Sequence, residues 1–386
     1  MIYDDWPADK PKPRLSAVIV ARDEEELLQG CIESMWYTPV YDDWPEPKRP
    51  IYDELVVVVA AESKDHTRAI AKKAKAKVGT FGPWPLDANG KEVRDYSELR
   101  NYAESLCSGD YIYWQDADEL LVAGHELIRD VVDKGVEDAV QPMMIWSRDE
   151  YGNPERTYCR QHLLHKKDAA KWSGKVHEWT DLAEGVTSRV DPGILHEQRE
   201  RAGGDRSHGD VFETLRENFS VGITNERHLF YLAREHAYAG HWAEAIGLLN
   251  IMLDNKAEWP MQRSSAAMLK GDGLHALGRV EEAREAYIRA VKEWGAWAEP
   301  YYAVGNLHYS LGQWAEGAAW LSASCLFDKP TDGNFTNDSI YQWRRYDLLA
   351  VCLSKIGRLE EARKYGEMAL AARPDDERLK ANMEFY

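Results

Sequence analysis

GDYIYWQDADE, residues 109–119, is the stretch of the chain that decides its fold. Its apolar centre, residues 111–115, predicts a buried strand, and Asp116 and Asp118 stand where that strand ends. Side chains two residues apart in an extended chain point the same way, so both carboxylates can face one divalent cation. Mg²⁺ and Mn²⁺ prefer such oxygen ligands, and both ions suit diphosphates. An isolated Asp-x-Asp is more often an acidic turn after a strand, so the surrounding sequence must decide.

Strand-like and helix-like stretches alternate on the N-terminal side of this motif. Short apolar or β-branched runs predict strands at 15–21 and 55–59, and helices are predicted at 27–35, up to 77 and at 96–107. This order is typical of an open, mainly parallel α/β sheet, in which ligands bind beyond the carboxyl ends of the strands. Asp65 and Asp118 both fall at such ends.

The second half of the chain repeats one phrase four times. In each copy a glycine closes one predicted helix, and the next helix opens two to five residues later. The glycines are Gly240, Gly278, Gly312 and Gly357, and they are separated by 38, 34 and 45 residues. Helical hairpins with this period are typical of tetratricopeptide repeats, so we predict an all-α repeat solenoid. The longest spacing contains residues 328–334, which predict an inserted loop.

Length and charge limit the classes of protein. A chain of 386 residues exceeds what one core usually serves, so we expect an α/β domain (1–205), a linker (206–225) and a repeat domain (226–386). The formal charge of -18 argues against nucleic acid as a partner. No apolar run reaches the length of a transmembrane helix, and Met1–Pro7 lacks the features of a signal peptide, so we expect a cytoplasmic protein.

The first half resembles a family 2 glycosyltransferase of the GT-A fold, in particular the branch that carries tetratricopeptide repeats. The resemblance extends from Leu15 to His196. It rests on ordered blocks at residues 15–25, 53–67, 95–119, 162–166 and 172–179. The most specific block, DYSELRNYA followed by GDYIYWQDADE, matches in both residue type and spacing. The resemblance implies a GT-A (Rossmann-like) nucleotide-sugar domain, followed by the repeats.

The resemblance implies that Arg22 and Asp65 lie near the nucleotide. The family commonly ends its second strand with an aspartate that contacts the nucleotide base, whereas this chain has Ala60 at the matching position. Glu62 lies close enough in the sequence to substitute for it. The identity of the base therefore stays open, and a UDP-sugar is the preferred donor.

The resemblance also implies a site for the diphosphate. Asp116 and Asp118 would hold the Mn²⁺ or Mg²⁺ that bridges it, and Arg100 and Asn101 would lie beside the sugar nucleotide. A cation and a guanidinium can offset the charge that develops on a departing nucleoside diphosphate. His196 is a further candidate ligand of the cation.

The catalytic base has several candidates. The last block ends in a His-Glu pair, in which Glu178 would accept the proton of the acceptor, and His177 would bind the metal or a phosphate. Asp149 and Glu150, beside a predicted hairpin at residues 151–154, are competing bases.

The resemblance implies a metal-dependent, inverting transfer of a sugar from a nucleotide sugar. A peptide or protein is the preferred acceptor, because the related branch includes enzymes that glycosylate peptides. The repeats would offer a surface for such a partner or for a second copy of the chain. Two alternatives stay open: an envelope or lipid-linked saccharide as the acceptor, and a repeat-based binding scaffold with a degenerate transferase domain.

Overall fold

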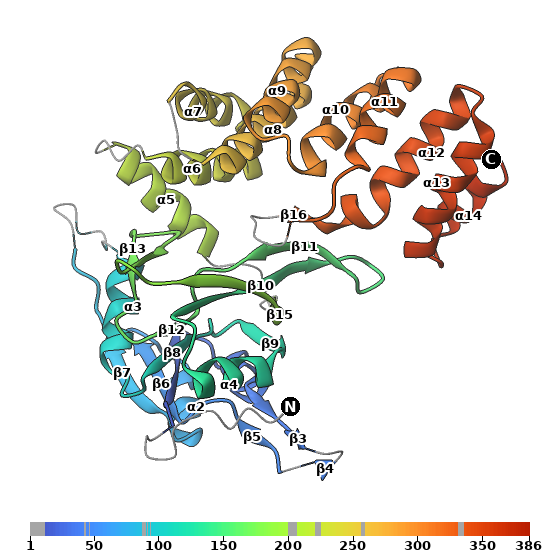
Figure 1. Cartoon of the computed structure of the whole chain (residues 1–386). Helices are drawn as coiled ribbons and strands as arrows, with labels where there is room; N and C mark the ends of the chain where they lie inside the picture. Colours follow the sequence, from blue (N-terminus) through green and yellow to red (C-terminus); the bar gives the residue numbers. More distant parts are fainter. Residues whose placement is uncertain are drawn as a thin grey trace. The chain divides into compact units, whose positions relative to one another are not determined.

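The computed structural model describes residues 12–41, 44–45, 47–86, 90, 92, 94–199, 207–220, 225–255, 259–330 and 336–386. The chain divides into two compact units (Figure 1). The first comprises Met1–Ser147 and Tyr158–Arg206, and the second comprises Arg148–Thr157 and Ser207–Tyr386. Four segments named above lie outside the described residues: the start of the chain, residues 200–206 where the predicted first domain meets the predicted linker, residues 221–224 of that linker, and residues 331–334 of the inserted loop.

The first unit is built on a parallel sheet. Its strands run in the order β7-β6-β1-β8, and they are β1 (Leu15–Ala21), β6 (Glu54–Ala60), β7 (Lys77–Phe81) and β8 (Tyr111–Trp114). Beyond β8 the sheet becomes mixed through β12 (Leu164–Lys166), β10 (Ala139–Arg148), β15 (Ser188–Gln198) and β9 (Glu119–Ala123). The predicted α/β fold is confirmed. It forms because central strands such as β6 are apolar on both faces, so helices must cover both faces of the sheet.

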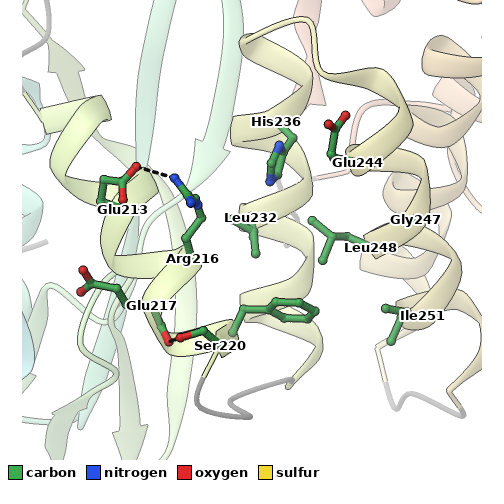
Figure 2. A pocket seen from close by; sticks show the side chains of 11 residues that line it. Glu213, Arg216, Glu217, Ser220, Leu232, His236, Glu244, Gly247, Leu248 and Ile251 are labelled. Atoms are coloured by element: carbon green, nitrogen blue, oxygen red, sulfur yellow. Dashed lines mark hydrogen bonds and ion pairs between the residues drawn. The ribbon is translucent and has the colours of Figure 1, made fainter.

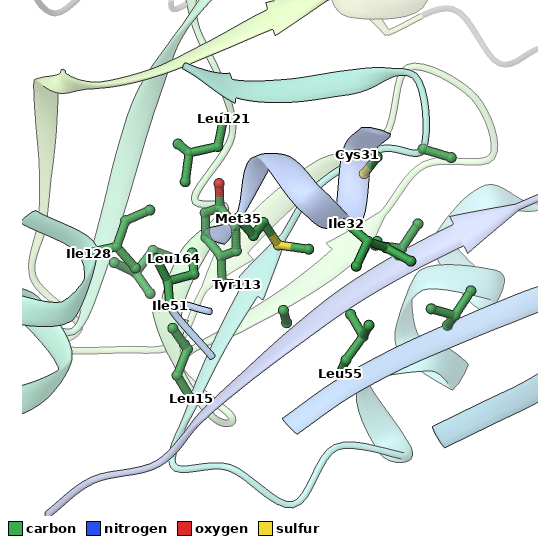
Figure 3. Close-up of a cluster of buried hydrophobic side chains, with 14 of the residues drawn as sticks. Leu15, Cys31, Ile32, Met35, Ile51, Leu55, Tyr113, Leu121, Ile128 and Leu164 are labelled. Atoms are coloured by element: carbon green, nitrogen blue, oxygen red, sulfur yellow. The ribbon is translucent and has the colours of Figure 1, made fainter. Parts of the chain in front are cut away.

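Helices cover both faces of this sheet. On one face, α1 (Leu28–Ser34), α2 (Thr67–Lys73) and α4 (His125–Lys134) contribute to the buried cluster around Tyr113 (Figure 3). On the other face, α3 (Tyr96–Ser105) packs against a cluster that contains Trp114. Outside the sheet lie three short pairs: β2 (Trp36–Tyr37) with β5 (Arg49–Pro50), β3 (Val40–Tyr41) with β4 (Trp44–Pro45), and β13 (Ala170–Ser173) with β14 (Trp179–Leu182).

The second predicted helix ends earlier than expected. It was predicted to reach residue 77, but α2 ends at Lys73, and Lys75 takes a left-handed φ of 59°. Residues 77–81 instead form β7, which pairs with β6. The Ala- and Lys-rich sequence favours a helix locally, and the prediction is wrong because pairing with a buried strand overrides that preference.

The second unit is mainly helical. It contains α5 (Ser207–Ser220), α6 (Glu226–Tyr238), α7 (Trp242–Asp254), α8 (Pro260–Ala276), α9 (Val280–Glu293), α10 (Ala298–Ser310), α11 (Trp314–Ser324), strand β16 (Thr336–Asn337), the π-helix η1 (Ile340–Arg344), α12 (Arg345–Lys355), α13 (Leu359–Ala372) and α14 (Glu377–Met383). Figure 1 shows α6 to α13 as successive helical hairpins. Gly240, Gly278, Gly312 and Gly357 each take a positive φ between the two helices of a hairpin, as a glycine C-cap requires. The four predicted repeats are therefore confirmed.

Helix α5 lies inside the segment that was predicted as a linker, residues 206–225. Its Leu215 is buried, and the Leu215 carbonyl is 3.0 Å from Nε2 of His228 in α6. The segment thus contains a helix packed against the first repeat. The predicted domain limits, 1–205 and 226–386, stay a prediction.

Residues 148–157 leave the first unit and pack within the second. Strand β11 (Pro154–Cys159) pairs with β16, and the Thr157 hydroxyl donates to Asp338 at 2.8 Å. At the other end of this segment, the Arg373 guanidinium donates to Asp149 at 3.0 Å and lies 4.4 Å from the ring centre of Trp343. Contacts at both ends therefore fix the segment to the helical unit.

Glu299 in α10 is a buried acid beside β16. Its Oε1 accepts a hydrogen bond from the backbone N–H of Asn337 at 2.8 Å. Burial, together with the charge of the nearby Asp338, raises the pKa of Glu299 to about 8, against the Asn337 hydrogen bond and the charges of Arg156 and Lys329. The folded protein therefore keeps a proton on Glu299 at a pH where the unfolded chain, with a carboxyl pKa of about 4.3, has lost it.

We expect this proton to make stability depend on pH. Between about pH 5 and 8 Glu299 keeps its proton in the folded state and has lost it in the unfolded state, so its contribution to the free energy of unfolding falls as pH rises. His125, His162 and His236, whose pKa values are lowered in the folded protein, act in the opposite direction at the acidic end of this range. Urea unfolding across this range should therefore show that the stability of the parent chain falls relative to that of Glu299→Gln as pH rises. Exposed Glu285 in α9 provides the matched control, Glu285→Gln. An unchanged slope in Glu299→Gln would contradict the assignment.

Candidate active site

The carboxyl ends of β1, β6 and β8 meet at one edge of the sheet, because these neighbouring strands are parallel. The loops after β1 and β6 are joined by hydrogen bonds. Asp23 Oδ1 accepts from the backbone N–H of Lys64 at 2.8 Å, and Asp65 Oδ2 accepts from that of Glu25 at 2.9 Å. Asp65 also accepts from the N–H of Thr67 at 2.9 Å. Asp65, which was predicted to lie near the nucleotide, thus holds these two loops together.

Arg22 and Glu62 lie together at this edge. Arg22 Nε is 3.6 Å from Glu62 Oε1. Both carboxylate oxygens of Glu62 are shielded from solvent, and among the described residues neither receives a hydrogen bond. A Cβ added at Gly82 would lie 3.2 Å from Glu62 Oε2, so the absence of a side chain there leaves room beside the carboxylate. Glu62 therefore has unused capacity to accept hydrogen bonds from a ligand.

Asp116 is the centre of a group of charged side chains that we name the carboxylate–arginine cluster: Arg100, Asp116, Glu119, Arg160 and Glu178. Arg100 donates to both oxygens of Asp116, at 2.9 and 3.3 Å, and through Nε to Glu178 at 2.6 Å. Arg160 Nη2 is 2.9 Å from Asp116 Oδ2 and 2.9 Å from Glu119 Oε1. The cluster links the loop after β8 to residues 160 and 178, which are distant in sequence.

The Arg100 guanidinium also lies on aromatic rings. It is 5.0 Å from the ring centre of Trp114 and 4.5 Å from that of Trp172. The indole N–H groups of both tryptophans donate to Glu104 Oε1, at 2.6 and 2.8 Å. Because the rings and their partner are fixed, the orientation of the guanidinium is fixed as well.

The charges of the cluster stabilise one another. Burial alone would raise the pKa of Asp116, but the neighbouring Arg100 and Arg160 hold that pKa well below its usual range. Burial likewise disfavours the charged form of Arg100, yet Asp116 and Glu178 keep its pKa above the usual value. Asp116 is therefore ionised at neutral pH.

His196 lies behind the cluster and is fully buried. Its Nδ1 is 3.2 Å from Glu119 Oε2, and its Nε2 is 2.9 Å from the hydroxyl of Tyr113. Since both ring nitrogens have protein partners, His196 does not fit the predicted role of a cation ligand. It instead orients Glu119, which in turn pairs with Arg160.

Three further residues that were predicted to bind the donor or the cation, Asn101, His177 and Asp118, lie in different surroundings. Asn101 bonds the backbone of Trp172 twice, with Nδ2 donating to its carbonyl at 2.8 Å and Oδ1 accepting from its N–H at 3.1 Å, so its amide holds β13. His177 immediately precedes Glu178 and takes a left-handed φ of 48°. Asp118 follows Asp116 in the same turn, and its carbonyl accepts from the N–H of Arg199 at 2.8 Å.

Asp149, the competing base, belongs to the second unit. Its Oδ1 accepts from the backbone N–H groups of Tyr151 and Asn153, each at 2.9 Å, and its Oδ2 accepts from Arg373 at 3.0 Å. Although partial burial opposes the effect, these hydrogen bonds lower the pKa of Asp149. A carboxylate with these partners closes a hairpin turn, and it is a weak proton acceptor.

A divalent cation fits the chemistry of Asp116 and Asp118. Among the described residues, no three His, Cys, Asp or Glu side chains converge in the way of a preformed metal site. However, the three carboxylates of the cluster, Asp116, Glu119 and Glu178, are opposed by only two guanidinium groups, which leaves a net charge of −1. One lone pair of Asp116 Oδ1 also stays unused by the arginines. Oxygen donors with this charge suit Mg²⁺ or Mn²⁺.

Sequence reasoning missed Arg160 and did not give Glu119 a role, although both belong to the cluster. Glu119 stands next to the aspartates in the quoted motif, and that position was a usable signal. Arg160 follows a strand whose partners are distant in sequence, and no local pattern marks it.

Comparisons with known proteins find a glycosyltransferase family. Residues 16–178 match the model of the family described as "Glycosyl transferase family 2", and this part of the chain is a domain of that family. It contains Arg100, Asp116 and Glu178. The chain is 34% identical over 108 residues to an uncharacterized glycosyltransferase of Rickettsia conorii, which covers 28% of this chain and 30% of that protein.

The same comparisons find repeat proteins. A TPR repeat-containing protein of Synechococcus elongatus is 33% identical over 109 residues, 28% of this chain and 21% of that protein. The chain thus spans less than a third of the length of either curated relative. Among solved structures, MamA is 18% identical with a TM-score of 0.36, over 44% of this chain and 91% of that chain. YrrB, described as a TPR protein with an unusual peptide-binding site, is 13% identical with a TM-score of 0.36, over 46% of this chain and 84% of that chain.

No helix in the described part of the chain has both the length and the apolar character that crossing a bilayer requires.

Proposed function

We propose that the protein transfers a sugar from a nucleotide-sugar donor to an acceptor. The observation that carries this proposal is the carboxylate–arginine cluster, which lies in a family 2 glycosyltransferase domain at the ligand-binding edge of a parallel sheet. Ionised, fixed groups of both signs are suited to bind a cation and a diphosphate together.

The cluster supports a requirement for Mn²⁺ or Mg²⁺. Asp116 and Asp118 would hold the cation, which when bound offsets the negative charge of the leaving diphosphate. Arg100 and Arg160 already neutralise part of the carboxylate charge, and they are held by contacts to Glu178 and Glu119. A phosphate oxygen that enters the site can therefore receive hydrogen bonds from groups that need little reorganisation.

Glu178 is the proposed general base of an inverting reaction. One oxygen, Oε1, accepts from Arg100 Nε, and a second oxygen is left to receive the proton of the acceptor hydroxyl or amide. Removal of that proton accompanies a single attack on the anomeric carbon, and the bond from that carbon to the diphosphate oxygen breaks. The hydrogen bonds that hold Asp149 in its hairpin turn, and the lowered pKa that they cause, support Glu178 over Asp149 as the base.

Glu62 is the proposed contact of the nucleotide base. Its shielded carboxylate lacks a hydrogen-bond donor among the described residues, and it can accept the ring N–H of uracil. We expect Glu62→Ala to weaken binding of UDP by about tenfold, since a buried partner is lost. Isothermal titration with UDP and ADP checks this. Adenine offers no ring N–H, so similar losses for both nucleotides would contradict the assignment.

The acceptor is proposed to be a peptide or protein, for which tetratricopeptide-like hairpins offer an extended surface. The decisive experiment is a screen of sugar nucleotides for hydrolysis with and without Mn²⁺, followed by mass spectrometry of proteins and saccharides incubated with the active donor. Sugar on a polypeptide is the expected result. Sugar on an envelope saccharide would show that the acceptor is a saccharide. If the protein bound no nucleoside diphosphate, the alternative of a repeat-based binding scaffold would be favoured.

A further inference from the structure

The first repeat and helix α5 enclose a groove of about 550 Å³ within the second unit (Figure 2). Side chains of α5, α6 and α7 line it, among them Glu213, Glu217, Leu232, Glu244, Gly247 and Ile251. None of these lining residues belongs to the carboxylate–arginine cluster of the first unit. Its volume is in the range of sites that accept a few amino-acid side chains or a small molecule.

Gly247 is an unusual residue for its position in α7. A glycine inside a helix lowers helix stability, so a reason for it is expected. Other helix glycines have one: a Cβ would come within 2.4 Å of Tyr287 at Gly271 and within 2.7 Å of Leu321 at Gly305. At Gly247 a Cβ would meet no described atom within 4 Å. Packing does not explain this glycine, whereas an occupant of the groove would.

The groove combines an apolar floor with acidic walls. Leu232 and Leu248 are buried beneath it, while Ile251 keeps 44% of its surface exposed. Three glutamates line the groove against one arginine, Arg216, whose Nη1 already pairs with Glu213 at 2.8 Å. Figure 2 shows Glu244 beside the groove on α7, across from this pair. The lining thus carries an excess of negative charge over an apolar surface.

We propose that this groove binds a peptide segment of a partner protein that presents apolar side chains together with lysine or arginine. The apolar side chains would fill the space over Gly247 and contact Leu232 and Ile251. A cationic side chain would pair with Glu244 at the wall. The formal charge of -18 over the whole chain attracts cationic partners, which favours a basic peptide over an acidic peptide or a nucleic acid.

Peptide arrays of leucine and lysine in varied spacing, followed by fluorescence anisotropy in solution with the best binder, test this inference. We expect Gly247→Trp, which fills the groove, and Glu244→Lys, which reverses its charge, each to weaken binding by about tenfold or more. Glu316→Lys is the matched control, because exposed Glu316 occupies the same position in the third repeat. It should bind as the parent chain does.

Several results would overturn the inference. One is that the protein binds no peptide of the array, and another is that it binds a peptide equally well after its lysines are replaced by glutamate. The third such result is an equal loss of peptide affinity in Glu244→Lys and Glu316→Lys. Self-association that Gly247→Trp abolishes, seen by light scattering, would assign the groove to a second copy of the chain.

The inference concerns binding only, and it holds whether or not the bound peptide is the sugar acceptor. Asp116→Asn should therefore bind the peptide with unchanged affinity. Loss of binding in the groove variants and loss of transfer in the Asp116 variant are separate outcomes, so either proposal can fail alone.

Discussion

Asp116→Asn is expected to lower sugar transfer by about two to three orders of magnitude, the range seen when one preorganised electrostatic group is removed from an active site. The substitution keeps the shape of the side chain and removes its charge. The cation loses its proposed ligand, and Arg100 and Arg160 lose their shared partner. The rate of donor hydrolysis or transfer at saturating Mn²⁺ is the measurement.

Asp110→Asn is the matched control for this prediction. Asp110 lies just before the other end of β8, is exposed, and accepts a hydrogen bond from the N–H of Arg14 at 2.8 Å. It should retain parental activity. Circular dichroism must show that the Asp116 variant is folded, and full activity in a folded Asp116→Asn protein would refute the proposed role of the cluster.

Arg100→Ala is expected to lower the free energy of unfolding by about 3–5 kcal/mol, as when one partner of a buried ion pair is removed. The side chain of Arg100 is only 11% exposed, and its loss deprives Glu178 of its arginine partner and leaves Asp116 paired with Arg160 alone. Its contacts with Trp114 and Trp172 are lost as well. Urea unfolding, followed by tryptophan fluorescence, measures the change.

Arg358→Ala is the comparison for Arg100→Ala. Arg358 also pairs with a carboxylate, Glu361 at 2.6 Å, but its side chain is 53% exposed. Exposed ion pairs contribute about 0–1 kcal/mol, so the variant should unfold nearly as the parent chain does. If the two arginine variants lost similar, small amounts of stability, Arg100 would not be the electrostatic link of the cluster.

The sequence was sufficient for the features that depend on local pattern. The β-branched run of β6 and the strand that ends at Asp116 predicted the parallel sheet, because burial on both faces requires a continuous apolar run. The repeated glycines predicted the helical hairpins, because a left-handed turn after a helix favours glycine. Arg100, Asp116 and Glu178 were all named, and the structure brings them together.

Features that depend on distant contacts were not predictable in this way. His196 lies near the end of β15, where a cation ligand could stand. Whether its ring nitrogens are available to a cation depends on Tyr113 and Glu119, which are more than 70 residues away in the sequence. Asn101 stands beside Arg100 on α3, yet its amide bonds the backbone of Trp172. Arg160 joins the cluster through the topology of the mixed sheet, which sequence periodicity does not encode.

The segment Arg148–Thr157 has a consequence for modularity. The chain leaves the first unit at residue 148, re-enters it at residue 158 and leaves it again at residue 207, so no single cut separates the two units. A transferase fragment that ends at residue 205 would retain this segment and lose β16, Asp338 and Arg373, which hold it. The transferase domain and the repeats therefore cannot be exchanged independently. Recombination that replaced the repeats would have to preserve β16, Asp338 and Arg373, which contact this segment.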